Sequence, residues 1–302
     1  MHKVSICIPT YEQPKNLQKC LESIEIQTLK DFEIIITDDS KSNEILDIVD
    51  SFKDKLSIKY YKNLPVKGSP ENWNECIKHA SGKYIKILHH DDFFYKEDSL
   101  EKLVNILDES PESKVVFCSS RHVDSLYKNV SSHILKKRNM SRINNDPNIL
   151  FMGNLIGAPS IMMYHRDLNV YFDKRMKWLV DLDFYIQILY KNQFVYTDEE
   201  LICINIGEAN RVTYECENNK KINLYEHMIL FKKLDLRELP LNYKLYFLKL
   251  FLKFEVKSFD EIKEFELIRK KNDFKILFFI VKLLSPIYKL RSYVRTSVLN
   301  SD

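Results

Sequence analysis

Glycine is scarce in this chain, and the glycine-rich loops that bind phosphate are absent. Only 5 of the 302 residues are glycine, and neither G-x-G-x-x-G nor G-x-x-x-x-G-K occurs. In proteins that carry those motifs, backbone N–H groups of the loop hold the phosphates of a nucleotide. The sequence therefore argues against phosphate binding by a glycine-rich loop.

No pair of cysteines has the C-x-x-C spacing of zinc sites and thiol redox motifs. Cys7 and Cys118 lie inside apolar runs that are typical of strands. We therefore predict reduced, buried thiols in a cytosolic protein. The six cysteines are Cys7, Cys20, Cys76, Cys118, Cys203 and Cys216.

The chain also lacks an apolar run of ~18 residues, and its N-terminus does not resemble a signal peptide. We expect a cytoplasmic protein, and 45% hydrophobic with 29% charged residues is ordinary for one to three soluble domains. The net charge of +3 is too small to predict nucleic-acid binding. It is uneven, however, because residues 240–302 hold 13 Lys/Arg against 7 Asp/Glu.

The first hundred residues alternate between strand and helix patterns. The continuous β-branched run "FEIIIT" is typical of a strand covered on both faces, whereas Leu17, Cys20, Leu21 and Ile24 repeat at helical spacing. This alternation predicts a parallel sheet with helices on both faces. The expected strands are 4–8, 32–37, 57–61 and 83–88, and the expected helices surround Leu17–Ile24, Ile45–Val49 and Asn72–His79.

Polar clusters follow three of these strands. Thr10-Tyr11-Glu12 ends the first, Asp38-Asp39-Ser40 the second, and His89-His90-Asp91-Asp92 the fourth. Ligands of parallel sheets bind beyond the carboxyl ends of the strands. A single acidic pair is usually a turn or a helix cap, but three clusters at strand exits favour a binding site.

After residue 100 the pattern becomes less regular. We predict a helix at 100–107, a strand at 114–119, and polar, irregular chain at 120–148. A turn and strand at 157–164, a helix within 177–190 and the short strands "FVYT" and "LICIN" follow, and from about residue 219 the chain is helical.

Three segments together resemble family 2 glycosyltransferases with the GT-A fold. They are "VSICIPTYEQPKNLQKCLESI", "FEIIITDDS" and "NWNECIKHASGKYIKILHHDD", and the resemblance covers roughly residues 3–215. It implies an inverting enzyme that uses a nucleotide-sugar donor. It also implies a doubly wound, mostly parallel α/β sheet, here with a C-terminal helical extension. The domains expected are a donor half (1–100), an acceptor half (101–218) and a basic amphipathic extension (219–302).

The resemblance also assigns residues to the donor. It places Thr10, Tyr11 and Glu12, from the Pro-Thr-Tyr exit that begins at Pro9, along the uracil and ribose. Asp38 or Asp39 is expected to accept hydrogen bonds from the nucleoside, and Asn74 matches an asparagine near the nucleotide. Arg211 lies in a late segment that closes over the diphosphate or acceptor in family members; an ordinary surface arginine is the alternative. The donor-binding set is Pro9, Thr10, Tyr11, Glu12, Asp38, Asp39, Asn74, His89, Asp92 and Arg211.

The D-x-D metal motif of the family has a counterpart after the fourth strand. Asp91 matches its second acid, and His89 replaces the first, so His89 contacts the ribose, the metal or neither. Mg²⁺ and Mn²⁺ prefer oxygen ligands, and either would stabilise the leaving diphosphate. Adjacent strand residues point to opposite faces, so we expect Asp91 rather than Asp92 to bind the metal. Asp92 would orient a neighbour, and His90 would be packed or solvated.

The general base is assigned to Asp181, which matches the aspartate of a later helix in the family. Asp183 competes for the role, but the two are about 200° apart on an α-helix, so only one can face the cleft. Capping of the helix is the structural alternative for Asp181.

The C-terminal segment combines lysines with apolar helices. Lys249, Lys253 and Lys257 repeat at four-residue spacing among leucines and phenylalanines, and Lys275 and Lys282 mark the later helix "FKILFFIVKLL". Such helices bind an anionic membrane surface or pack on the catalytic domain, and the sequence leaves both open.

The resemblance implies a glycosyltransferase that adds a sugar, UDP-linked in the donor, to a bacterial surface glycan or its lipid-linked precursor. It would be cytoplasmic or peripheral on the inner face of the membrane, and would bind no nucleic acid. Two alternatives stay open. One is a nucleotidyltransferase with a related metal-dependent sheet, and the other is a degenerate nucleotide-binding protein at the membrane.

Overall fold

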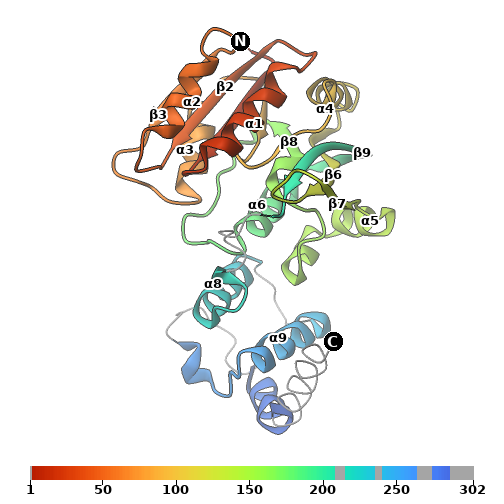
Figure 1. Cartoon of the computed structure of the whole chain (residues 1–302). Helices are drawn as coiled ribbons and strands as arrows, with labels where there is room; N and C mark the ends of the chain where they lie inside the picture. Colours follow the sequence, from red (N-terminus) through yellow and green to blue (C-terminus); the bar gives the residue numbers. More distant parts are fainter. Residues whose placement is uncertain (1, 208–214, 235–239, 264–273, 286–302) are drawn as a thin grey trace. The chain divides into compact units, whose positions relative to one another are not determined.

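The computed structural model describes residues 2–207, 215–234, 240–263 and 274–285 (Figure 1). The chain divides into two compact units, Met1–Val212 and Thr213–Asp302. Among the described helices, none combines the length and the hydrophobicity needed to cross a bilayer.

The strands of the first unit form one sheet. They are β1 (Val4–Thr10), β2 (Phe32–Asp38), β3 (Ile58–Lys62), β4 (Tyr84–Ile87), β5 (Phe93–Phe94), β6 (Ser113–Val123), β7 (Asn129–His133), β8 (Met162–His165) and β9 (Gln193–Asn205). Their order is β3-β2-β1-β4-β8-β6-β9-β5, with β7 paired to β6. The first four strands are parallel, as predicted, and β8 then runs antiparallel to both β4 and β6. This mixed, mostly parallel sheet confirms the predicted α/β fold class.

The helices of this unit cover the sheet. They are α1 (Pro14–Glu25), α2 (Glu44–Phe52), α3 (Glu71–His79), α4 (Ser99–Asp108), α5 (Lys137–Asn145) and α6 (Val180–Leu189), with short 3₁₀ turns η1 (Pro147–Met152), η2 (Pro159–Ile161) and η3 (Arg166–Leu168). Every residue of β1 and β2 is buried. Right-handed crossovers explain this burial: the chain steps outward from β1 to β3 through α1 and α2, then returns past β1 through α3. α1 and α2 therefore cover one face and α3 the other.

The prediction of irregular chain at 120–148 was wrong. β6 continues to Val123, β7 pairs with it as an antiparallel strand, and α5 follows. Four of the five residues of β7 are exposed, and Ile143 is the single buried residue of α5. Neither element therefore carries the apolar periodicity from which a sequence reveals strands and helices.

The two short strands expected at "FVYT" and "LICIN" are one strand, β9. Its pairing with β6 shifts register at several places, and the widest shift lies between Thr197 and Glu200, where a bulge interrupts the ladder. The polar residues at this bulge explain why the sequence suggested two strands.

The second unit is helical in its described parts, as predicted. It contains α8 (Lys220–Lys233), α9 (Leu241–Lys253), the 3₁₀ turn η4 (Phe259–Glu261) and a helix over residues 274–285. Phe247 and Phe251 of α9 pack against Phe274 and Phe278, with ring centroids 5.1 Å (Phe247–Phe274) and 5.4 Å (Phe251–Phe278) apart. Across the whole chain, all six cysteines are free and buried, as expected for reduced thiols.

Candidate active site

The polar segments that follow β1, β2 and β4 lie together at one edge of the sheet. Thr10 pairs in register with Asp38. The Nδ1 atom of His90 lies 3.2 Å from the carbonyl oxygen of Pro9. Because a carbonyl only accepts, this contact places the proton of a neutral His90 on Nδ1. The strand order therefore brings the three clusters together, as the sequence indicated.

Asp38 is buried and its acceptor positions are filled by the chain itself. Its Oδ1 accepts from the Thr10 hydroxyl (3.2 Å) and the Ser40 N–H (2.8 Å), and its Oδ2 accepts from Tyr60 (2.7 Å) and Lys62 (2.8 Å). Burial alone would raise the pKa of this carboxyl, but these hydrogen bonds outweigh burial and lower the pKa. A carboxylate offers about four lone-pair positions. Asp38 is thus occupied in holding the edge of the sheet together.

Asp39 holds the loop that follows β3. Its Oδ1 accepts from the Asn63 amide (2.8 Å) and the Lys67 N–H (3.1 Å), and its Oδ2 accepts from the Gly68 N–H (2.6 Å). Gly68 has φ +77°, which favours glycine at this turn. With three donors among the described residues, Asp39 keeps one acceptor position, so of the two aspartates it is better able to accept from a nucleoside.

Tyr11 and Glu12 leave the end of β1 toward solvent. The Tyr11 side chain is 53% exposed. Glu12 has φ +54°, its N–H donates to the Ser40 hydroxyl (2.6 Å), and its carboxylate accepts from the Lys41 N–H (3.0 Å). The backbone after Thr10 is therefore held in place, and the Tyr11 ring stays free to stack on a planar group.

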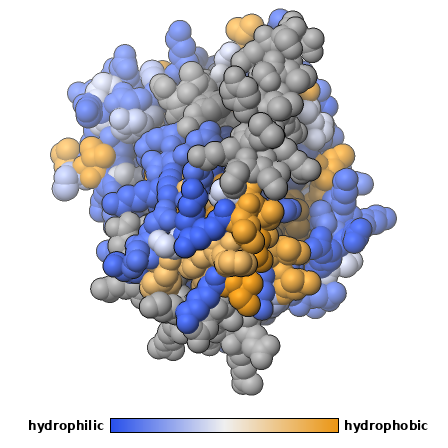
Figure 2. All heavy atoms as spheres, turned by 90° about the horizontal axis from the view of Figure 1, so that it is seen from below, coloured by the Kyte–Doolittle hydropathy of each residue, from blue (hydrophilic) through white to orange (hydrophobic). Residues whose placement is uncertain are grey.

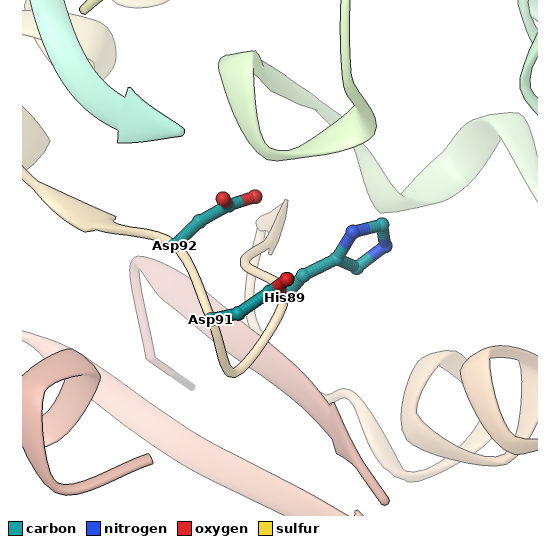
Figure 3. A group of neighbouring side chains, drawn as sticks. All are labelled: His89, Asp91 and Asp92. Atoms are coloured by element: carbon teal, nitrogen blue, oxygen red, sulfur yellow. The ribbon is translucent and has the colours of Figure 1, made fainter. Parts of the chain in front are cut away.

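The cluster after β4 is a turn rather than an extended strand. The Asp92 N–H donates to the carbonyl of His89 (2.9 Å) and closes the turn. One ligand atom from each of His89, Asp91 and Asp92 lies within 4.8 Å of the others, and Figure 3 shows the three side chains leaving the turn on the same side. The expectation that strand alternation separates Asp91 from Asp92 was therefore wrong, because alternation does not apply in a turn.

His89 presents an unpartnered nitrogen. Its Nε2 is buried and has no hydrogen-bond partner among the described residues, and its ring packs against Trp73 with centroids 4.6 Å apart. Burial lowers the pKa of His89 to about 4, and the charge of Asp91 offsets only part of this. The imidazole is thus neutral at pH 7. Two carboxylates with a neutral imidazole are a donor set that fits a small divalent cation.

Asp92 is held more firmly than Asp91. It is buried, and its Oδ1 accepts from the Asn205 N–H at the end of β9 (3.1 Å). Burial is the larger cause that raises the pKa of Asp92, and the charge of Asp91 raises it further. Asp91 is partly exposed, so Asp91 is the carboxylate better placed for a cation and Asp92 supports the turn.

A buried lysine lies behind this turn. Lys86 is fully buried in β4, and its Nζ donates to the carbonyl oxygens of Ile87 (3.0 Å) and Ser160. Burial lowers the pKa of Lys86 to about 8. The Ser160 hydroxyl in turn accepts from the His89 N–H (3.0 Å). Lys86 and Ser160 thus tie η2 to β4 and to the turn.

Asp181 and Asp183 occupy different environments in the first turns of α6. The Oδ1 of Asp181 is buried and has no partner among the described residues, and burial raises its pKa to about 7. Asp183 is more fully buried, and its Oδ2 accepts from the Gln187 side chain (2.6 Å). A carboxyl group with an unpartnered oxygen and a pKa near 7 is suited to accept a proton at neutral pH.

One short segment connects α6 to the turn. The Tyr185 hydroxyl, one helical turn beyond Asp181, donates to the carbonyl of Gly157 (2.9 Å). Three residues later, Ser160 accepts from His89. The segment 157–160 therefore contacts both the helix that carries Asp181 and the turn that carries His89.

The sequence of the chain matches the model of the family "Glycosyl transferase family 2" over residues 5–172, more than half of its length. The chain belongs to glycosyltransferase family 2. The resemblance carried by the three sequence segments is thereby confirmed.

Relatives of this family 2 glycosyltransferase include proteins with and without an assigned reaction. An uncharacterized glycosyltransferase of Rickettsia prowazekii is 29% identical over 207 residues, 66% of this chain and 62% of the relative. The GalNAc(5)-diNAcBac-PP-undecaprenol beta-1,3-glucosyltransferase of Campylobacter jejuni is 37% identical over 94 residues, 30% of each chain. The matched region spans 62–65% of the length of several curated relatives.

Solved structures show the same fold. TarS of S. aureus (residues 1–349), in complex with UDP-GlcNAc, has a TM-score of 0.62 at 19% identity. The match covers 92% of this chain and 79% of the TarS chain. The mannosyltransferase PcManGT of Pyrobaculum calidifontis, in complex with GDP-Man and Mn²⁺, has a TM-score of 0.59 at 12% identity. The match covers 94% of this chain and 87% of PcManGT. At these identities the likeness supports the GT-A fold alone.

Two residues expected at the donor need separate comment. Both amide atoms of Asn74 bond to the backbone of Phe172 (2.8 Å each), so this family 2 enzyme uses Asn74 to anchor the segment before α6. Arg211 lies outside the described residues.

Sequence reasoning missed three residues that shape the site: Lys86, Ser160 and Asn205. Asn205 is buried, its Oδ1 accepts from the Gly207 N–H (3.0 Å), and its Nδ2 has no partner among the described residues. A lysine inside an otherwise apolar strand was the one signal available. Ser160 and Asn205 act through contacts 71 and 113 residues away, with His89 and Asp92 respectively.

Proposed function

We propose that this family 2 glycosyltransferase transfers a sugar from a UDP-linked donor to a hydroxyl of a bacterial surface glycan or lipid-linked precursor, with inversion at the anomeric carbon. The observation that supports it most is the turn of His89, Asp91 and Asp92, tied through residues 157–160 to the helix of Asp181. The names of its relatives agree, because TarS was solved with UDP-GlcNAc and the Campylobacter enzyme is named for an undecaprenol-linked acceptor.

A divalent cation, Mn²⁺ or Mg²⁺, completes the proposed site. Asp91 and the unpartnered Nε2 of His89 would hold it, with Asp92 supporting the turn from behind. When bound, such a cation neutralises the charge that develops on the departing diphosphate.

Donor recognition is assigned to the edge formed by β1 and β2. We propose that Pro9 and Thr10 shape the pocket wall and that Tyr11 stacks on the uracil. The remaining acceptor position of Asp39 would receive a hydrogen bond from the nucleoside. Glu12, Asp38 and Asn74 hold this framework through the contacts described above, and Arg211 is proposed to close over the diphosphate.

Asp181 is proposed as the general base. The acceptor hydroxyl oxygen attacks the anomeric carbon and its proton passes to Asp181. The bond between that carbon and the diphosphate oxygen breaks, and the diphosphate leaves with the bonding electron pair. A base within hydrogen-bond reach of the attacking hydroxyl contributes about 10²–10⁴ in rate.

The proposal includes a location. Residues 240–302 carry the basic excess of the chain, and peripheral attachment on the cytoplasmic face of the membrane would place the site next to a lipid-linked acceptor.

A donor screen tests the proposed activity. The melting temperature of the full chain is measured with UDP-, GDP- and nucleoside-triphosphate ligands, each with and without Mn²⁺. We expect a UDP-sugar with Mn²⁺ to stabilise most, since a ligand that binds only the folded state raises its stability. Release of UDP on adding acceptor supports transfer. Release of pyrophosphate from a nucleoside triphosphate, or donor binding without any turnover, contradicts it.

A further inference from the structure

The helix over residues 274–285 is apolar on both of its faces. One face is buried, with Phe274, Leu277, Phe278 and Val281 each less than 10% exposed. The opposite face exposes Ile276 (69%), Phe279 (64%) and Leu283 (60%). Large apolar side chains that repeat at i, i+3 and i+7 form a continuous stripe on a helix, and contiguous exposed apolar surface usually marks an interaction site.

Lysines border this stripe. Lys275 and Lys282 directly precede Ile276 and Leu283, so they lie along one edge of the stripe. Both are exposed. Neither pairs with a carboxylate among the described residues, and the helix contains no acidic residue.

The neighbouring helix α9 extends the same pattern. Leu241 and Leu245 are exposed, followed at the same four-residue spacing by exposed Lys249 and Lys253. α9 also contains no acidic residue. Ring contacts between Phe251 and Phe278 pack the two helices together. Figure 2 shows one face of the molecule on which apolar side chains gather in a patch, with hydrophilic side chains beside it.

We infer that the stripe of Ile276, Phe279 and Leu283 is a membrane-contact face that inserts into an anionic leaflet, with Lys275 and Lys282 at the headgroups. An apolar face bordered by lysines, on a helix that contains no acidic residue, has the charge and the geometry of helices that lie in the plane of a bilayer. The long lysine side chains reach the polar headgroups while their methylene groups follow the apolar surface. This inference deepens the peripheral attachment within the proposed function by naming the face that makes it.

Vesicle flotation of the full chain tests the face. We expect binding to vesicles of phosphatidylglycerol to exceed binding to phosphatidylcholine vesicles and to weaken with added salt. Phe279→Glu is expected to lower the affinity about tenfold or more, because the side chain can no longer be buried among acyl chains. Lys275→Gln with Lys282→Gln is expected to lower it about 30-fold, at roughly fivefold for each lysine near an anionic surface.

Leu126→Glu is the matched control, since Leu126 is 71% exposed in the first unit. It is expected to bind vesicles as the unchanged chain does. All variants change exposed side chains, so melting temperature and UDP-sugar affinity with Mn²⁺ should stay constant. Constant donor affinity also separates this inference from the proposed function, because the donor screen and the product analysis test that function on the unchanged chain, without vesicles.

Two results would overturn the inference. One is vesicle binding that is equal for both lipids, or equal for the chain with and without Phe279→Glu. The other is a dimer in light scattering that Phe279→Glu converts to a monomer, with no vesicle binding by either. That result would make the stripe an interface between two copies of the chain.

Discussion

A carboxyl group is buried at the amino-terminal edge of the sheet, and another is buried in the candidate active site. The two groups differ in how many hydrogen bonds they accept. At the amino-terminal edge, Glu33 of β2 accepts from Ser5 (2.6 Å), from the Ser81 N–H and hydroxyl (2.7 Å each) and from Lys59 (2.7 Å). In the candidate site, the Oδ1 of Asp181 has no partner among the described residues.

The pKa values of the two groups diverge accordingly. Burial acts to raise both, but the hydrogen bonds to Glu33 outweigh it and lower its pKa to about 2, whereas burial alone raises the pKa of Asp181 to about 7. A fully bonded carboxylate stabilises a fold. An unbonded one is costly to bury and is kept where chemistry needs it. The predictions below test this distinction.

The largest expected effect is on turnover when Asp181 is replaced. Asp181→Asn should retain the shape and the donor affinity but lose about 3–5 kcal/mol of transition-state stabilisation, roughly 10²–10⁴ in rate. Asp183→Asn should be much milder, because Asp183 already bonds to Gln187. Turnover is measured for both at matched folded fraction. If Asp183→Asn is the inactive variant, Asp183 is the base; if both stay active, the base lies elsewhere.

Replacement of Glu33 should show the reverse pattern. Glu33→Ala leaves the buried Ser5 hydroxyl and the Ser81 N–H without the carboxylate that accepts from them, so we expect about 2–4 kcal/mol less stability in urea unfolding. Turnover per folded molecule should change little. Lys59→Ala is the control, because Lys59 is exposed and its loss should cost less than about 1 kcal/mol. A Glu33→Ala chain that keeps its stability but loses its activity would contradict the assignment of a structural role to Glu33 and a chemical role to Asp181.

Loss of Asp91 should act on donor binding alone. Removing an outer-shell partner of a metal ligand costs about 10–100-fold in affinity, so removing Asp91 itself should cost about 100-fold or more. Calorimetric titration of Asp91→Ala with UDP-sugar and Mn²⁺ measures this, and the melting temperature without ligand should be unchanged because Asp91 is partly exposed. Unchanged Mn²⁺-dependent affinity would show that the metal assignment is wrong.

The smallest expected effect is a pH-dependent gain in stability for Asp181→Asn. The raised pKa of Asp181 means that the folded state prefers the protonated form. The contribution of Asp181 to the free energy of unfolding is fully present below about pH 4 and is lost as the pH rises through about 7. Asp181→Asn should therefore be about 1–3 kcal/mol more stable than the unchanged chain at pH 8 and equal to it near pH 4. Equal stability at both pH values would mean that Asp181 titrates normally.

The sequence predicted those helices and strands in which the pattern of buried residues can be recognised within a short stretch of the chain. The runs in β1 and β2 are buried on both faces, and the spacing of Leu17 and Leu21 reports the core face of α1. β7 and α5 are largely exposed, so their sequences carry no such signal. The edge of the sheet on which polar clusters gather followed from strand order alone.

The details of the site depended on contacts between distant residues. The turn at His89–Asp92 could not be distinguished from a continuing strand, and Asn74 meets the backbone of Phe172 98 residues later. Ser160 gave no sign in sequence of its bond to His89. Strand order can place a residue at an edge, but the partner of each side chain depends on the packed tertiary structure.

Lys86 has a consequence for how the sheet assembles. Until β8 is in place, β4 is the edge of a four-stranded parallel sheet, and the unpaired N–H and C=O groups of such an edge can recruit strands from other chains. A lysine on that edge opposes such pairing because its charge cannot be buried without a partner. The correct strand brings its partner with it, since the Ser160 carbonyl that receives Lys86 lies in η2, directly before β8. We therefore expect Lys86 to disfavour pairing of β4 with strands of other chains and to favour its pairing with β8.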